Sequence, residues 1–174
     1  MIVRLFSPDS DFNLVKEWIS DARLHALWCA NRMPFPLTRS AFDAFMLEEA
    51  KQYGNQQYAA VSDDGITVGY YCCSVDAASG DAMLKFVVVS PEMRGHGYGR
   101  EMIRLAVRKI FTETNAQLIR LNVFSVNTPA IRCYLHAGFT VESDIEGAFP
   151  FGEETWGRTQ MAIRRAAVLA ETVE

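Results

Sequence analysis

The chain has 174 residues, of which 49% are hydrophobic and 22% charged, and its formal net charge at pH 7 is −4. A chain of this size and composition can bury one substantial core, so we expect a single domain. The acidic balance and the lack of clustered Lys and Arg argue against nucleic acid as the main partner, because phosphate backbones are bound chiefly by such clusters. No apolar run approaches the roughly 18 residues of a membrane span, so we expect no membrane partner.

The expected elements begin with a strand near residues 1 to 6. This start lacks the charged leader, apolar run and cleavage site of an export signal, so we expect a cytoplasmic protein. Two helices are expected next, near residues 11 to 20 and 39 to 52. The remaining expected elements are strands near 57 to 62, 66 to 75 and 81 to 89, a helix near 98 to 113, a strand near 118 to 124, a helix near 129 to 137, and strands near 139 to 147 and 155 to 163. We expect the domain to span residues 1 to 166, followed by a C-terminal tail of residues 167 to 174.

The four cysteines, Cys29, Cys72, Cys73 and Cys133, show no metal-ligand spacing. The adjacent pair would point to opposite faces of a strand. We expect all four to be reduced and buried. The three histidines are isolated in sequence, so no metal site is expected.

A glycine-rich segment, Arg94-Gly95-His96-Gly97-Tyr98-Gly99, stands between the apolar run 86 to 89 and a helical pattern that begins near Arg100. Glycines at every second position let successive backbone N–H groups turn towards one anion at a helix start, where unpaired donors and the helix dipole favour negative charge. A nucleotide P-loop is excluded because no Lys-Ser or Lys-Thr pair follows. A dinucleotide loop would need its third glycine at Arg100. A turn that merely changes chain direction stays open.

A second pattern lies about thirty residues downstream, where a strand ends and a short helix begins. Thr128 can cap this helix, Pro129 suits its first position and Gly138 suits its end. Tyr134 shares a helix face with Ala130, Ile131 and Leu135, so it points towards the core. By this spacing alone, Tyr134 is equally a core tyrosine.

Together the two segments resemble the GNAT superfamily of acyl-CoA-dependent N-acyltransferases. The glycine loop of that family reads Gln or Arg, two residues, Gly, any residue, then Gly or Ala, and Arg94, Gly97 and Gly99 match it. The family also carries an Asn after its fifth strand, a Tyr seven places on and a Gly-Phe pair, as Asn127, Tyr134 and Gly138-Phe139 do here. The sequence around these motifs is most similar to that of ribosomal-protein N-terminal acetyltransferases. The motifs cover residues 84 to 139.

The resemblance implies a fold of the α/β (α+β) class: a single-domain acetyltransferase fold with a mixed seven-stranded sheet, helices on both faces, and splayed strands 4 and 5. It also implies acetyl-CoA as co-substrate, with no metal. Backbone N–H groups of residues 95 to 100, in Gly95, His96, Gly97, Tyr98, Gly99 and Arg100, would hold the pyrophosphate. Main-chain groups of Val87 and Val89 would pair with the pantetheine arm.

The resemblance also implies catalytic roles. A main-chain N–H near Val88 or Val89 would stabilise the oxyanion formed when an amine attacks the thioester. Asn127 would hydrogen-bond the arm or an ordered water. Tyr134 would protonate the departing thiolate. Arg94 and Arg100 lie close enough to the loop to contact phosphate.

The general base departs from the family pattern, because Met83 and Asn122 stand where some relatives carry Glu. A water relay to Glu142, Glu153 or Glu154 is one solution. Another is an acceptor amine of low pKa, such as a protein N-terminus or a small-molecule amine. A non-catalytic acyl-CoA-binding regulatory module is the alternative function.

The acceptor side is expected from the first two helices and the loop joining the last two strands. Residues 141 to 156 carry five acidic and no basic side chains, so this loop can attract a cationic acceptor, although acidic residues on a solvated hairpin are ordinary. A homodimer through exposed strand edges or the C-terminal segment is compatible with the sequence.

Overall fold

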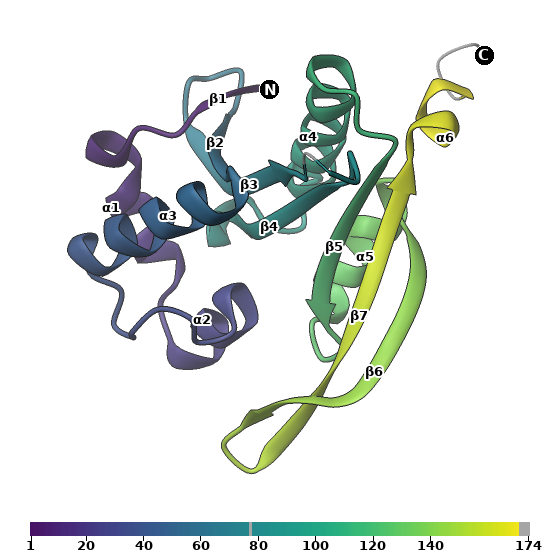
Figure 1. The fold of residues 1–174 in the computed structure, drawn as a ribbon. Coiled ribbons are helices and arrows are strands. Elements are labelled where there is room, and N and C mark those ends of the chain that lie inside the picture. Colours follow the sequence, from purple (N-terminus) through teal and green to yellow (C-terminus); the bar gives the residue numbers. More distant parts are fainter. Residues whose placement is uncertain (77, 171–174) are drawn as a thin grey trace.

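The structure, a computed structural model, describes residues 1 to 76 and 78 to 170 (Figure 1). The elements run β1 (Ile2–Leu5), α1 (Pro8–Trp18), α2 (Ala22–Cys29), α3 (Arg39–Tyr53), β2 (Gln56–Val61), β3 (Thr67–Val75), β4 (Ala82–Val89), the 3-10 helix η1 (Pro91–Met93), α4 (Tyr98–Glu113), β5 (Leu118–Phe124), α5 (Thr128–His136), β6 (Thr140–Phe151), β7 (Glu154–Arg164) and α6 (Arg165–Ala170).

A seven-stranded mixed sheet in the order β1-β2-β3-β4-β5-β7-β6 organises the chain. Among the described strands only β4 and β5 pair in parallel, and every other neighbouring pair is antiparallel. The expected α/β fold with a mixed seven-stranded sheet is confirmed. A parallel pair requires a crossover connection, which α4 supplies here.

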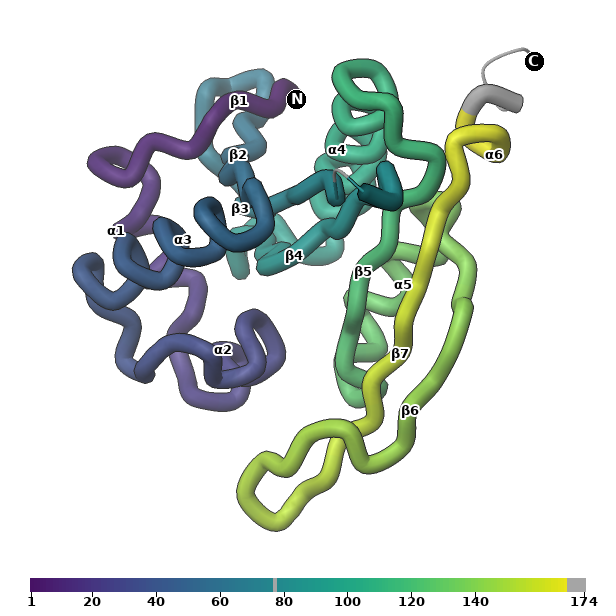
Figure 2. Tube along the Cα trace, in the orientation of Figure 1, coloured from purple at the N-terminus to yellow at the C-terminus, as the bar shows by residue number. Residues whose placement is uncertain are grey.

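Helices cover both faces of this sheet, as the strand alternation in β3 shows. Tyr71 and Cys73 belong to the core cluster that includes the buried face of α4. Tyr70 and Cys72 point to the other face and join the core formed with α1, α2 and α3. Because successive strand residues face opposite sides, one strand serves both cores. Figure 2 traces α1 to α3 together, on the other side of the sheet from α4 and α5.

The amphipathic pattern after the glycine loop folds as predicted. The buried residues of α4 are Met102, Ile103, Ala106, Val107, Ile110 and Phe111. Their spacing of three and four places them on one helix face, which packs against the sheet. This packing fixes the position of α4, and therefore of the glycine loop that precedes it, relative to β4.

Three helices precede β2, whereas the sequence predicts two. The additional helix, α2, has eight residues and is capped by Asp21, whose side chain accepts a hydrogen bond from the Leu24 N–H at 2.7 Å. A helix this short carries little periodic signal and gains its stability from tertiary packing. Trp28 and Cys29 provide that packing in the core shared with α1 and α3.

The start of α5 also differs from the prediction. Asn127, not Thr128, is the N-cap residue, and its Oδ1 accepts a hydrogen bond from the Ala130 N–H at 3.4 Å. Tyr134 is buried as expected, but Leu135 is 47% exposed and does not share its environment. Only a narrow face of α5 packs against the core, so Leu135, the residue next to Tyr134, already faces solvent.

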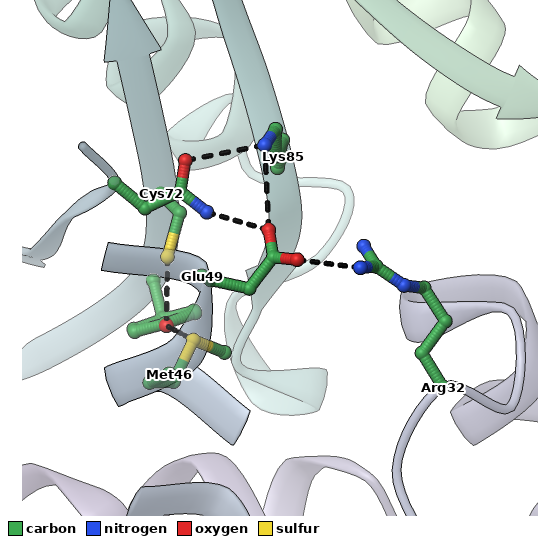
Figure 3. A network of polar contacts seen from close by, with 7 residues as sticks. Arg32, Met46, Glu49, Cys72 and Lys85 are labelled. Carbon is green, nitrogen blue, oxygen red and sulfur yellow. Dashed lines mark hydrogen bonds and ion pairs between the residues drawn. The ribbon is translucent and has the colours of Figure 1, made fainter. Parts of the chain in front are cut away.

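A buried carboxylate ties α3 to β4 (Figure 3). The side chain of Glu49 is 3% exposed and pairs with Arg32 and with Lys85, the latter at 3.3 Å. Asn55 donates to Glu49 at 2.7 Å and accepts from Lys85 at 3.2 Å. Each partner thus has a further polar contact, as a buried charge requires. The network fixes β4 at Lys85.

The C-terminal helix α6 spans the boundary expected at residue 166, and residues 171 to 174 lie outside the described part of the chain. The described cysteines are free, and Cys133 is half-buried while the other three are buried. Within residues 1 to 76 and 78 to 170, no helix combines the length and apolar character needed to cross a membrane.

Candidate functional site

The strands β4 and β5 separate after a short paired segment, as predicted. Only Ala82 with Ile119 and Met83 with Arg120 are paired between them in the described chain. From Leu84 and Leu121 onward the strands diverge, and Figure 1 shows β5 running away from the end of β4. We call the diverging segments 84 to 89 and 121 to 124 the splay. One edge of β4 is therefore left without a strand partner in a central part of the sheet.

The free edge of β4 presents the main-chain groups of alternate residues. The Ser90 N–H donates to the Val68 carbonyl at 2.9 Å, so Ser90 faces β3. Main-chain polar groups alternate direction along a strand, so Val88 also faces β3 and Val89 faces the splay. Of the two residues considered for an oxyanion donor, Val89 is therefore the one with its N–H on the free edge.

A β-bulge bends β4 just before this edge. Phe86 has a φ of 51°, and the register with β3 shifts between Tyr70 and Cys72. A bulge of this kind kinks a strand, so it bends β4 further along the segment that has already left β5 at Leu84. The Trp28 indole N–H donates to the Phe86 carbonyl at 2.8 Å and so holds the bulge from α2. Sequence reasoning missed this contact, and a positive φ at a phenylalanine leaves no sequence signal.

The glycine loop leads directly into α4. Gly95 and Gly97 have φ values of 80° and 86°, a region that favours glycine. Gly97 is the N-cap residue and provides no side-chain cap. The first N–H groups of a helix have no intrahelical partner, so those of Tyr98, Gly99 and Arg100 remain available to an anion. His96 is exposed on this loop.

A close approach brings the loop, β4 and α5 together. A Cβ built on Gly99 would lie 3.3 Å from the Cys133 Sγ and 3.5 Å from a Val89 methyl. A larger side chain at Gly99 would push these elements apart. Burial raises the pKa of the Cys133 thiol, and the positive charge of Arg100 opposes that rise. Arg100 therefore lies near both the helix start and α5.

Arg94 connects the loop to the end of β4. Its Nε–H donates to the Val89 carbonyl at 3.2 Å. Desolvation of the guanidinium lowers its pKa, and the Asp21 carboxylate acts in the opposite direction. The residue as a whole is exposed, so Arg94 remains accessible from solvent. Arg94 thus places a positive charge between the glycine loop and the first turn of α2.

A cavity of about 550 Å³ lies on the other side of the loop, lined by residues that include His96 and Tyr98. The rest of its lining includes four carboxylates, from Asp63, Asp64, Glu92 and Glu101. Those charges would repel a phosphate. Because of these carboxylates, we expect an anion to bind at the start of α4 and not in this cavity.

Tyr134 projects from α5 into the core beside the splay. Its side chain is 7% exposed and lies 6.1 Å, centroid to centroid, from Phe139. Burial raises the pKa of its hydroxyl well above the usual value, so the group is protonated at neutral pH. Among the described residues, none forms a hydrogen bond with the Tyr134 hydroxyl. The Asn127 Oδ1, in contrast, is used in capping α5. The hydroxyl can donate a proton or hydrogen bond to a bound molecule.

Carboxylates near the splay are engaged by arginines. Glu142 accepts from Arg120 at 2.8 Å and lies 3.5 Å from Arg164. Since Arg120 pairs with Met83, Glu142 stands at the closed end of the splay. Glu154 pairs with Arg23, and these contacts lower the pKa of its carboxyl. A low pKa makes Glu154 a poor proton acceptor.

Comparison with known proteins gives the family. The Acetyltransferase (GNAT) family pattern matches residues 18 to 139, and the chain belongs to this family. Streptothricin acetyltransferase from Streptomyces lavendulae is 32% identical over 91 residues, which cover 52% of this chain and 48% of that protein. The uncharacterized N-acetyltransferase YokL from the SPbeta prophage of Bacillus subtilis (strain 168) is 30% identical over 100 residues, covering 57% and 56%. The chain thus spans about half the length of the curated relatives it matches.

Solved structures of the same fold include spermidine N-acetyltransferase from Vibrio cholerae in complex with CoA and spermine. The TM-score is 0.81 over 97% of both chains, at 17% sequence identity. A mutant of the same Vibrio cholerae enzyme gives a TM-score of 0.79 over 99% of both chains at 16% identity. At this identity the likeness establishes the fold. The expected single-domain acetyltransferase fold is therefore confirmed.

Proposed function

We propose that the chain is an N-acetyltransferase that moves the acetyl group of acetyl-CoA to a primary amine by direct attack in a ternary complex. The separation of β4 from β5 carries this proposal. It leaves the main-chain edge of Val89, the uncapped start of α4 and the Tyr134 helix beside one another. We place the activity in residues 1 to 166.

The donor fits the groups that surround the splay. The N–H groups at the start of α4 and the positive φ of Gly95 and Gly97 suit a pyrophosphate, with Arg94 and Arg100 beside it. Main-chain groups of Val87 and Val89 would pair with the amides of the pantetheine arm as an added strand would. Val88 would contribute its side chain to the core and not its N–H to the donor.

The chemistry needs a stabilised oxyanion and a protonated leaving group. The Val89 N–H would donate to the thioester oxygen as the amine nitrogen forms its bond to the carbonyl carbon. As the carbon–sulfur bond breaks, the Tyr134 hydroxyl would give its proton to the thiolate. Asn127, fixed by its capping bond to Ala130, would orient the arm or a water through its remaining amide group. This direct transfer requires no metal ion.

The acceptor should be an amine that is partly neutral without help. Neither Met83 nor Asn122 can take a proton, and Glu142 and Glu154 are held by arginines. An α-amino group has a pKa near 8, whereas that of lysine is near 10.4, which reduces the neutral fraction of lysine at pH 7 by about two to three factors of ten. A protein N-terminus or a low-pKa small-molecule amine is therefore favoured. The similar proteins are named for small molecules, spermidine and streptothricin, and not for a protein N-terminus.

Thiol release from acetyl-CoA tests the proposal. The reaction would be followed with peptides that carry a free N-terminus, peptides blocked there but carrying lysine, polyamines, aminoglycosides and amino acids. We expect turnover with at least one low-pKa amine. Tight CoA binding without turnover on any amine would instead identify a non-catalytic acyl-CoA-binding module. Equal turnover on blocked lysine peptides would contradict the preference for a low-pKa amine.

A further inference from the structure

Arg23 contacts a carboxylate and two aromatic rings of the β6–β7 hairpin. Both guanidinium Nη atoms donate to Glu154, one of them at 3.0 Å. The guanidinium carbon lies 5.0 Å from the Trp156 ring centroid and 5.8 Å from that of Phe151. We call Glu154, Trp156 and Phe151 the cation cage. A cation over the faces of aromatic rings beside a carboxylate is attracted by both.

The cage is organised by its own contacts. The rings of Trp156 and Phe151 stack with centroids 4.6 Å apart and an interplanar angle of 26°. The Trp156 indole N–H donates to Glu154 at 2.9 Å, which orients the carboxylate. Trp156 is only 1% exposed, so its position is fixed by the core of the hairpin. The cage is thus a built cation site rather than a chance surface pair.

Two chains of contact place the cage beside the open end of the splay. On one side, the helix α2 that carries Arg23 contacts β4, where the Trp28 indole N–H donates to the Phe86 carbonyl at 2.8 Å. On the other, the ring of Trp156 lies 5.4 Å from that of Phe124, the last residue of β5. The cage therefore lies near the ends of both diverging strands, on the side closed by α2.

Arg23, which occupies the cation cage in this structure, is not buried there. Arg23 is the second residue of α2, whose first turn holds no acidic residue, and the N-cap Asp21 attracts its guanidinium. A positive charge at a helix N-terminus is opposed by the helix dipole. The Arg23 side chain is also 45% exposed, so its guanidinium is within reach of water. Arg23 can therefore exchange between the cage and water without unfolding the hairpin.

We propose that the cation cage binds a second, non-reacting cationic group of the acceptor, and that Arg23 is a displaceable occupant of this site. The proposal rests on the proposed transferase function and specifies its substrate class: amines that carry a further ammonium or guanidinium group. Exchange of one cation for another leaves the cage neutralised. A second cation within the acceptor also lowers the pKa of the reacting amine, because like charges disfavour protonation. That effect assists an active site in which Glu142 and Glu154 are held by arginines.

The indole N–H resonance of Trp156 reports on the cage independently of turnover. The chain has three tryptophans, so a Trp156→Phe variant assigns the signal in a ¹H–¹⁵N spectrum. The full-length protein with CoA would be titrated with 1,4-diaminobutane and, as the matched probe, with n-butylamine. We expect 1,4-diaminobutane to shift the Trp156 resonance at lower concentration than n-butylamine does.

Two substitutions separate displacement from simple attraction. Arg23→Gln should tighten the apparent Kd for 1,4-diaminobutane by about three- to fivefold, because it removes the internal competitor. Glu154→Gln should weaken it by about tenfold. Arg39→Gln is the control, since Arg39 pairs with Asp9 and Asp43 and lies 5.8 Å from the Phe12 ring, outside the proposed site. It should leave the Kd unchanged.

An unchanged or weaker Kd in Arg23→Gln overturns the proposal, as does equal tightening in Arg39→Gln, which would indicate a bulk charge effect. Equal affinities of the wild type for the two amines also overturn it. Should Arg23→Gln fail to fold, the Glu154→Gln titration and the wild-type comparison still decide. A Trp156 shift with the diamine but no thiol release from any amine would retain the cage and reject the transferase. Turnover on monoamines with no Trp156 shift would retain the transferase and reject the cation cage.

Discussion

The Nε–H of Arg94 donates a hydrogen bond to the main-chain carbonyl of Val89 at 3.2 Å, and this contact links the glycine loop to the free edge of β4. Arg94→Ala removes both the link and a positive charge beside the proposed phosphate site. We expect the Kd for CoA, measured by calorimetry, to rise about tenfold. Arg104→Ala is the control, because Arg104 also donates to a carbonyl, that of His136, but lies farther along α4. Equal effects of both variants would contradict a specific role for Arg94.

Gly97 tests the shape of the loop. Its φ of 86° strains any residue with a Cβ, so Gly97→Ala should destabilise the fold by about 1 to 2 kcal/mol. It should also weaken CoA binding, since the N–H groups of the first turn of α4 lose their alignment. Gly65→Ala is matched, with a φ of 80° and no heavy atom within 4 Å of the new Cβ. It should cost similar stability in urea unfolding while leaving the CoA Kd unchanged.

Tyr134→Phe tests the proposed proton donor. We expect kcat to fall by about 10- to 100-fold with little change in the Kd for CoA. Because burial raises the pKa of Tyr134, the wild type should show no loss of rate from its ionisation as the pH rises from 7 to 10. Tyr71→Phe is the comparison, since the Tyr71 hydroxyl is buried without a described partner. An unchanged kcat in Tyr134→Phe would remove the acid role.

The Glu49 network should support β4 energetically. Glu49→Ala leaves Lys85 without its carboxylate partner and should lower the free energy of unfolding by about 3 kcal/mol. Its neighbour Glu48 pairs with Lys51 at 2.8 Å but is 70% exposed, so Glu48→Ala should cost less than about 0.5 kcal/mol. Urea unfolding followed by circular dichroism compares the two. A similar small loss in both would show that the network contributes little.

Sequence reasoning predicted the elements that carry regular patterns. The helix over 98 to 113 and the strand over 118 to 124 were predicted at their observed bounds, because buried residues recur at helical or strand spacing there. The β4–β5 splay followed only from the family resemblance, since no local pattern encodes the loss of pairing between two strands.

Features that depend on long-range contacts escaped prediction. The helix α2 is stabilised by packing through Trp28, and the bulge at Phe86 by a hydrogen bond from that same residue. Arg23 and Glu154 are 131 positions apart in sequence. The sequence predicts that Asn127 contacts the donor, and this stays a prediction. Its capping bond to Ala130 could not be predicted, because it depends on where α5 begins.

Backbone hydrogen exchange at single-residue resolution, with and without acetyl-CoA, shows whether the free edge of β4 and the start of α4 bind the donor. We expect slower exchange at the Val87 and Val89 amides and at Tyr98, Gly99 and Arg100, with little change in β1 and β2. Unchanged exchange at Val89 and at the start of α4, in a sample saturated with acetyl-CoA, would contradict the proposed donor site.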